Sequence, residues 1–205
     1  MILNTLIDSI ESVWPMLTIF LVVIITIRIT YLRINREHFV FYKEFGNLFF
    51  VIYILLLFQL LTNAELNNIG GLNLVPFTEI LRYEIGSMLF YYNVIGNILI
   101  FVPFGYFVSV YIKAKKISHI FFISIISSLT VEFVQLQIGR SFDIDDILLN
   151  VVGSIIGFLI YVSLNAIRKH LPKFFQSDLF YNILCLIICL FFIYCYYKSI
   201  GFGWL

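Results

Sequence analysis

The chain has 205 residues, of which 61% are hydrophobic and only 12% are charged, and its mean hydropathy is +1.01. A water-soluble domain of this size has too little interior to hide so much apolar surface, so that class of protein is excluded. The formal net charge of +1 provides no basic field for nucleic acid. The composition therefore predicts an all-α, polytopic integral membrane protein with a single membrane domain over residues 1–205.

Apolar stretches of about 18 or more residues, each long enough to cross the ~30 Å hydrocarbon core of a bilayer as a helix, recur along the chain. We expect these spans at about residues 14–32, 47–62, 88–112, 117–137, 146–167 and 179–197. The second span is the shortest, so an arrangement of five spans is the alternative. The fifth span ends at Arg168-Lys-His-Leu-Pro172, a basic segment followed by a proline that cannot continue the helix.

The distribution of Lys and Arg predicts the orientation of the spans. The loops at 28–45, 113–116 and 168–178 hold ten of the 13 basic residues. By the positive-inside rule these three loops lie in the cytoplasm and both termini lie outside. An arrangement of five spans would break this alternation, which favours six. Before the first apolar stretch the chain has Asp8 and Glu11 but no basic residue, so we expect no cleavable signal peptide.

Two loops lie on the predicted outer side. The loop at 63–87 contains Gly70-Gly71 and the apolar, proline-containing stretch Leu74–Phe77, which is typical of a re-entrant or interfacial segment. The loop at 138–146 is short and acidic. Five of the charged residues of the chain lie between positions 132 and 146, where this second loop joins two apolar spans.

One face of the fourth span is polar. Ser124, Ser128, Glu132 and Gln135 have the spacing that places them on the same side of a helix. Glu132 lies about 22 Å from the cytoplasmic start of this helix, in the outer third of the membrane. An ionised carboxylate there costs at least ~2.5 kcal/mol unless it is paired, protonated or hydrated, so we expect a functional role for Glu132.

The neighbouring spans bring further polar residues to the same depth. Asn97 lies in the outer third of the third span, and Asn150 follows the start of the fifth. Asp143 or Asp145 can cap the fifth span, because a carboxylate is favoured at the positive end of a helix dipole. The stretch Gly153-Ser-Ile-Ile-Gly157 is a small-residue packing surface. Polar residues from three spans are thus predicted to converge. The alternative is structural, since polar side chains also hold transmembrane helices together by about 0.6 kcal/mol each.

At these residues the chain resembles the VanZ-like family. The matching pieces lie within about residues 47–165 and are Asn73–Phe77, Asn97–Gly105, Val131–Gln135, Gly139-Arg140 and Asp143–Gly157. The resemblance implies a multi-pass protein of the bacterial cytoplasmic membrane, linked to low-level resistance to teicoplanin, a glycopeptide with a fatty acyl tail. It implies no agreed biochemical activity, and a general role in the cell envelope is equally consistent. By position, the polar signature of the family falls on Asn97, Glu132, Gln135, Arg140, Asp143, Asp146 and Asn150.

Three functions are open at this point. The first, which we favour, is a non-enzymatic protein that protects the cell surface by binding a lipoglycopeptide in an outward polar pocket. The second is an enzyme that acts on a lipid-linked cell-wall precursor, with Glu132 as general acid or base. In that case Asp143, Asp145 and Asp146 are weak candidates for holding a divalent cation. The third is a lipid transporter or flippase, against which the lack of internal repeats argues. The expected partners are membrane lipids and either a lipoglycopeptide or a lipid-linked cell-wall precursor, and we expect no nucleic acid and no cofactor.

Overall fold

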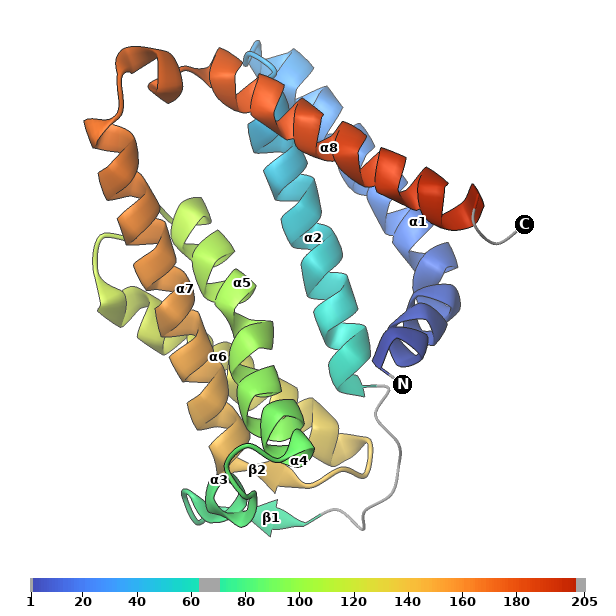
Figure 1. The fold of residues 1–205 in the computed structure, drawn as a ribbon, viewed down its shortest axis with the longest axis vertical. Coiled ribbons are helices and arrows are strands. Elements are labelled where there is room, and N and C mark those ends of the chain that lie inside the picture. Colours follow the sequence, from blue (N-terminus) through green and yellow to red (C-terminus); the bar gives the residue numbers. More distant parts are fainter. Residues whose placement is uncertain (1, 63–70, 202–205) are drawn as a thin grey trace. The chain divides into compact units, whose positions relative to one another are not determined.

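The computed structural model describes residues 2–62 and 71–201, and nearly all of this chain is helical (Figure 1). Within the described residues, six helices are long and apolar enough to cross a membrane, judged by length and composition. They are Trp14–Asn35, Phe41–Leu60, Met88–Tyr111, Ile117–Gln137, Ile144–His170 and Asp178–Cys195. The predicted all-α membrane fold with six spans is therefore confirmed.

The elements follow one another in a simple order. The long helices are α1 (Ile2–Asn35), α2 (Phe41–Thr62), α5 (Gly96–Tyr111), α6 (Ile117–Gln137), α7 (Ile144–His170) and α8 (Asp178–Gly201). The short elements are β1 (Leu72–Asn73), α3 (Thr78–Arg82), α4 (Met88–Phe90) and β2 (Phe142–Asp143). A π-helical turn at Tyr91–Ile95 joins α4 to α5, and a 3-10 turn at Lys173–Gln176 precedes α8.

The second span begins at Phe41, several residues before the predicted start at 47. The charged residues that made this stretch look like loop are paired. Arg28 of α1 donates from Nε to Oε2 of Glu44 at 2.7 Å, and Lys43 lies 3.3 Å from a carboxylate oxygen of Asp178. Because pairing lowers the cost of carrying charge on a transmembrane helix, the helix extends toward the loop.

The chain divides into two units. One comprises the residues up to Leu17 together with Tyr53–Leu164, and the other comprises Thr18–Ile52 and Asn165–Leu205. The first unit contains α5, α6, α7 as far as Leu164, and every residue of the predicted polar site. The second contains the C-terminal part of α1, the N-terminal part of α2, the last residues of α7, and α8.

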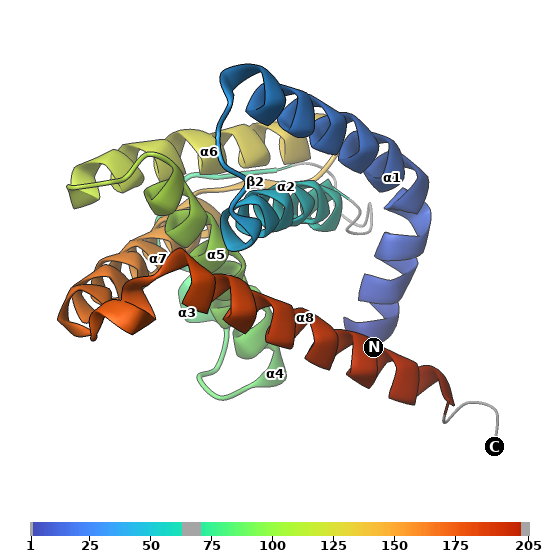
Figure 2. The same ribbon diagram turned by 90° about the horizontal axis from the view of Figure 1, so that it is seen from above.

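In the first unit, α5 and α7 lie side by side in both views (Figures 1 and 2). Their backbones approach closely at Gly105, Gly153 and Gly157. A Cβ at Gly153 would collide with the carbonyl oxygen of Ile98, and one at Gly157 with that of Val102. The small-residue packing surface expected at 153–157 is thus confirmed, and Gly105 of α5 is its counterpart.

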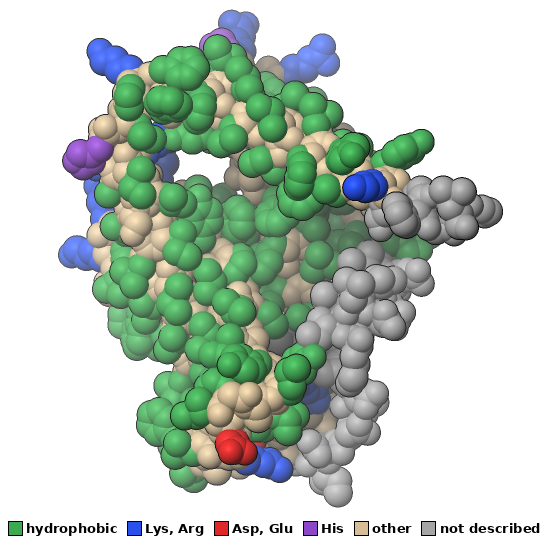
Figure 3. Space-filling model, in the orientation of Figure 1, with side chains coloured by type: hydrophobic (Ala, Val, Ile, Leu, Met, Phe, Trp, Pro, Cys, Tyr) green, Lys and Arg blue, Asp and Glu red, His purple; other side chains and the backbone are tan. Residues whose placement is uncertain are grey.

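The polar face predicted for α6 is also confirmed. Its buried residues are Ile120, Ser124, Ser128, Glu132 and Gln135. Asn150 of α7 donates from Nδ2 to Oγ of Ser128 at 2.8 Å, so hydrogen bonding joins the two helices in the interior. Hydrophobic side chains cover most of the visible surface (Figure 3), as expected for helices that face lipid.

Candidate ligand-binding site

A cavity of about 430 Å³ lies in the first unit, at the end of α5, α6 and α7 that is farthest from the turn between Tyr111 and Ile117. Its wall is formed by the β1–α3 segment, the start of the third span, the end of α6 and the start of α7. All residues expected to bind ligand line it, namely Asn97, Glu132, Gln135, Arg140, Asp143, Asp146 and Asn150. The structure therefore brings the whole predicted set together in one place.

A two-residue parallel strand pair joins the two loops at this end. Leu72 pairs with Phe142, and Asn73 pairs with Asp143. The backbone N–H of Phe142 donates to the carbonyl of Gly71 at 2.9 Å, and Asn73 Nδ2 donates to Asp143 Oδ1 at 3.2 Å. Residues 63–70 of the predicted re-entrant loop lie outside the described residues. The part from Gly71 onward forms a wall of the cavity.

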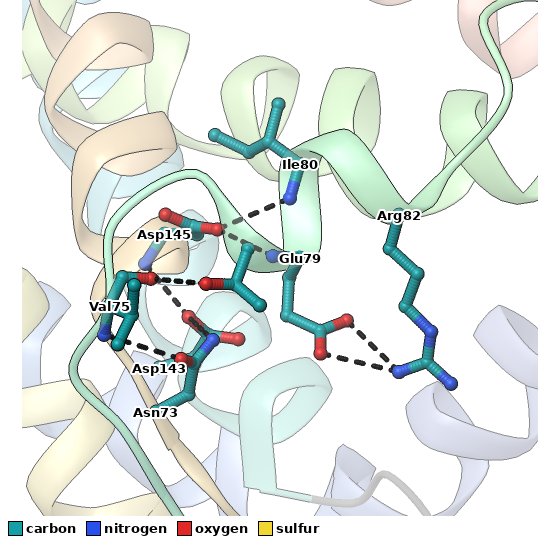
Figure 4. Close-up of polar contacts among 8 residues, drawn as sticks. Asn73, Val75, Glu79, Ile80, Arg82, Asp143 and Asp145 are labelled. Atoms are coloured by element: carbon teal, nitrogen blue, oxygen red, sulfur yellow. Dashed lines mark hydrogen bonds and ion pairs between the residues drawn. The ribbon is translucent and has the colours of Figure 1, made fainter.

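Asp145 anchors that wall. Asp145 is only 1% exposed, and its two carboxylate oxygens accept three backbone N–H groups of the β1–α3 segment. Figure 4 shows those of Glu79 and Ile80. Oδ1 accepts from Phe77 at 2.6 Å, and Oδ2 accepts from Glu79 at 2.8 Å and from Ile80 at 3.2 Å. Phe77, the residue before α3, has a left-handed backbone (φ 68°) and offers no capping side chain. Asp145 therefore acts as the N-terminal cap of a helix more than 60 residues away in sequence.

The cap of α7 is Asp143, one of the two residues predicted for that role. Its Oδ1 accepts from the backbone N–H of Asp145 at 2.8 Å. Asp143 lies just outside the membrane-spanning part of α7. Burial raises the pKa of its carboxyl, and hydrogen bonds from the Asp145 N–H and the Asn73 amide oppose that rise.

We expect the stability of an Asp143→Asn variant to depend on pH in a defined direction. Because the folded-state pKa is raised, protonation of Asp143 favours the folded state, and this contribution is lost as the pH rises through that pKa. The amide of Asn can still accept both hydrogen bonds but cannot ionise. Thermal unfolding in detergent should show the variant nearly equal to wild type at acid pH and increasingly more stable than wild type toward neutral pH.

Glu84→Gln serves as the control for that measurement, because Glu84 is exposed and does not line the cavity. It removes one negative charge without touching the hydrogen bonds of Asp143. A stability difference between Asp143→Asn and wild type that stays constant across the same pH range would contradict the assignment.

Glu132 is buried on α6, with 1% of its surface exposed. Its Oε2 accepts from the backbone N–H of Asp143 at 2.9 Å, which ties α6 to β2. On the opposite side, Asn97 Nδ2 of α5 donates to Asp146 Oδ1 of α7 at 2.5 Å. Arg140 interacts electrostatically with both carboxylates, those of Glu132 and Asp146. One guanidinium thus interacts with two acidic groups that come from different helices.

Arg140 is placed by the end of α6. Its backbone N–H donates to the carbonyl of Gln135 at 2.9 Å, and the preceding Gly139 has a positive φ of 88°. This is the left-handed conformation that commonly ends a helix and that glycine adopts without strain. The Gly139-Arg140 pair therefore turns the chain so that Arg140 lines the cavity.

The geometry gives no support to the cation role considered for Asp143, Asp145 and Asp146. Among the residues that the structure describes, no group of three or more His, Cys, Asp and Glu side chains is placed to hold a metal ion. Both oxygens of Asp145 already accept backbone N–H groups. A carboxylate so engaged has little left to offer a divalent cation, which takes six or more oxygen ligands.

Several residues that line the cavity were not singled out for the site from the sequence. They are Asn73, Glu79, Arg82, Tyr83, Asn93 and Ser141, with Arg82 paired to Glu79 at 3.2 Å. Most of them precede the third span, in a loop where no apolar period indicates which side chains share a face. The stretch Asn73–Phe77 could have indicated from the sequence that this loop belongs to the site, because it is one of the pieces that resemble the family.

Comparison with known proteins identifies relatives of this chain. A family model described as VanZ/LLP1 matches residues 16–168, a longer region than the 47–165 in which the resemblance is strongest. The chain is also 32% identical over 124 residues to Protein VanZ of Enterococcus faecium, which covers 58% of this chain and 70% of that protein. No solved structure gives a significant match. The extent of the family match, together with this relative, shows that the chain belongs to the VanZ/LLP1 family.

Proposed function

We propose that this protein protects the cell envelope against a lipoglycopeptide such as teicoplanin by binding it at the polar cavity, without catalysis. The observation that carries the proposal is the composition of the cavity wall. Amide, carboxylate and guanidinium groups face one space inside a protein that is otherwise apolar. Such a wall suits a ligand with many hydroxyl and amide groups, because a few convergent polar groups fix the orientation of a bound molecule.

The rim of the cavity suits the acyl tail of such a ligand. The β1–α3 segment exposes Leu72, Val75, Phe77 and Leu81, and Leu81 is 80% exposed. These side chains border the polar wall residues Asn73 and Glu79 in the same segment. A molecule with a sugar–peptide head and a hydrocarbon tail therefore has a polar surface and an apolar surface next to each other.

The orientation in the membrane follows from the charges at the two ends of α5 and α6. The turn between these helices carries Lys113, Lys115 and Lys116 and lies at the end opposite the cavity. By the positive-inside rule the turn lies in the cytoplasm, which puts the cavity at the outer leaflet of the cytoplasmic membrane and both termini outside. That is the side from which a glycopeptide reaches the cell.

The proposal predicts that two substitutions abolish teicoplanin protection. Glu132→Gln replaces the carboxyl group by an amide of nearly the same shape, and Arg140→Ala removes the cation itself. Loss of one charge-assisted hydrogen bond costs about 1.5–3 kcal/mol, so we expect binding to weaken roughly tenfold to hundredfold. In a susceptible host, the minimal inhibitory concentration of teicoplanin should fall to that of the empty vector.

Two controls make this test specific. Glu84→Gln removes an exposed carboxylate outside the cavity and should protect as well as wild type. Each variant must reach the membrane in amounts equal to wild type, measured by immunoblot. If both cavity variants protect at wild-type levels with equal expression, the cavity is not the agent of resistance.

A second candidate function is catalysis on a lipid-linked precursor. It is favoured by one feature: two carboxyl groups of the wall, those of Glu132 and Asp146, both interact electrostatically with Arg140. Incubation of the purified protein with such precursors, followed by mass spectrometry, separates the two functions. A changed precursor that depends on Glu132 would replace the binding proposal with an enzymatic one.

A further inference from the structure

A second cavity, of about 320 Å³, lies between α1 and α2 in the other unit. Its wall is apolar over most of its length, with Ile25, Ile29 and Leu32 from α1 and Phe41, Leu48 and Val51 from α2. Figure 2 shows the short loop that joins α1 to α2. The cavity has the size of a small-molecule site. Hydrocarbon chains suit a groove of this kind.

An ion pair between α1 and α2 lies part-way along the groove. Arg28 donates from Nε and Nη2 to the two carboxylate oxygens of Glu44 at 2.7 and 2.8 Å. A guanidinium has five N–H donors, so Arg28 keeps donors beyond the two that Glu44 accepts. Arg28 lies about 10 Å before the end of α1. At that depth the acyl chains of a bilayer meet the ester and phosphate groups, whose oxygens are hydrogen-bond acceptors.

Two further guanidinium groups lie just beyond the groove. Arg33 is in the last turn of α1, and Arg36 follows the helix. Both side chains are exposed, and neither forms an ion pair with any side chain in the described part of the chain. Glu44 and Glu37 lie 2.7 and 3.9 Å from the Arg28 guanidinium, and Asp178 pairs with Lys43. Three guanidinium groups face these two glutamates, so a net positive charge is left for an anion.

We infer that this groove binds an anionic phospholipid from the cytoplasmic leaflet. One acyl chain lies between α1 and α2, the ester or phosphate oxygens accept from Arg28, and the headgroup charge faces Arg33 and Arg36. Basic pockets between transmembrane helices on the cytoplasmic side recognise anionic headgroups in this way. The site shares no lining residue with the polar cavity and does not depend on its function.

The test is native mass spectrometry of the full-length protein in detergent, titrated with phosphatidylglycerol or with phosphatidylethanolamine of the same acyl chains. We expect wild type to retain phosphatidylglycerol preferentially. Each basic residue near an anionic lipid contributes about 1 kcal/mol, so the double variant Arg33→Ala with Arg36→Ala should bind it about thirtyfold more weakly. Glycerol phosphate, which has the headgroup without the chains, should not bind measurably.

Two further variants distinguish binding of the lipid in the groove from a general attraction of anionic lipid to basic residues. Lys115→Ala with Lys116→Ala also removes two exposed cytoplasmic charges, but neither residue lines the groove, so phosphatidylglycerol binding should be unchanged. Ile29→Trp fills the groove and should weaken binding of both lipids, while the thermal unfolding midpoint reports whether the variant is folded. Equal loss in the two double variants, or no preference of wild type for the anionic lipid, would overturn the inference.

Discussion

Replacing Asp145 by alanine is expected to release the segment from Gly71 to Tyr83 from the helices beneath it. The substitution leaves the N–H groups of Phe77, Glu79 and Ile80 without their acceptor. Hydrogen bonds to a charged group contribute about 1.5–3 kcal/mol each, and buried donors that lose their partner add a desolvation cost. Because a released segment regains some hydrogen bonds to water, we expect a local loss of about 3–5 kcal/mol.

Hydrogen exchange followed by mass spectrometry measures this effect directly. Amides of the 77–83 peptide should exchange at least a hundredfold faster in Asp145→Ala than in wild type, since 1.4 kcal/mol corresponds to one factor of ten. Peptides from the middle of α6 should be unchanged. Because the released segment forms a wall of the cavity, teicoplanin protection should be lost as well.

Asp178→Ala is a matched control, because Asp178 also accepts hydrogen bonds from another part of the chain but is exposed at 48% of its side-chain surface. Exposed ion pairs contribute about 0–1 kcal/mol, so this variant should remain close to wild type. Asp145→Asn keeps one acceptor oxygen. The 77–83 peptide of this variant should therefore exchange faster than in Asp178→Ala and more slowly than in Asp145→Ala. Wild-type exchange of the 77–83 peptide in Asp145→Ala would show that the segment is held by other contacts.

The role of Asp145 marks the limit of what the sequence predicts. The helices were predictable because each apolar stretch matches the thickness of a membrane, and the polar face of α6 because four residues repeat with helical spacing. The partners of Asp145, in contrast, lie 65 to 68 residues earlier in sequence. They are backbone groups of a loop with no periodic pattern, and backbone N–H groups are present at every residue except proline. Sequence spacing therefore contains no signal for this contact.

The three aspartates show the same limit. In sequence Asp143, Asp145 and Asp146 look like one acidic cluster that could share a cation. In the structure they lie where a strand becomes a helix, so successive side chains point in different directions. Asp143 meets Asn73, Asp145 meets the backbone of α3, and Asp146 meets Asn97. Their proximity along the chain thus predicted that the three aspartates lie together at one end of the helices. It did not predict that each has a different partner.

The second large effect is expected from Gly157→Ala in α7. A Cβ at this position would collide with the carbonyl oxygen of Val102 and the backbone nitrogen of Tyr106, which belong to α5. Backbone atoms inside a helix cannot move aside as the end of a flexible side chain can, so the two helices must separate. Added volume in a tightly packed interface costs about 1–3 kcal/mol of folding stability. Because the added Cβ meets backbone atoms, we expect Gly157→Ala to lose about 3 kcal/mol or more.

Gly46→Ala in α2 is the matched control, because a Cβ there meets no atom within 4 Å. Alanine is the better helix former by about 1 kcal/mol, so this variant should be as stable as wild type or slightly more stable. Thermal unfolding in detergent should therefore move the two variants in opposite directions. Equal midpoints would mean that α5 and α7 do not pack with their backbones in contact.

The same substitution tests whether helix packing and the polar cavity are coupled. Asn97 lies on α5 and Asp146 on α7, and the hydrogen bond between them crosses the interface that Gly157 closes. Separation of the helices should lengthen that contact and reduce teicoplanin protection even where the protein still reaches the membrane. Protection that survives in a folded but destabilised Gly157→Ala variant would show that the cavity tolerates movement of α5 against α7. In that case the ligand would have to be held by α6, α7 and the β1–α3 segment alone.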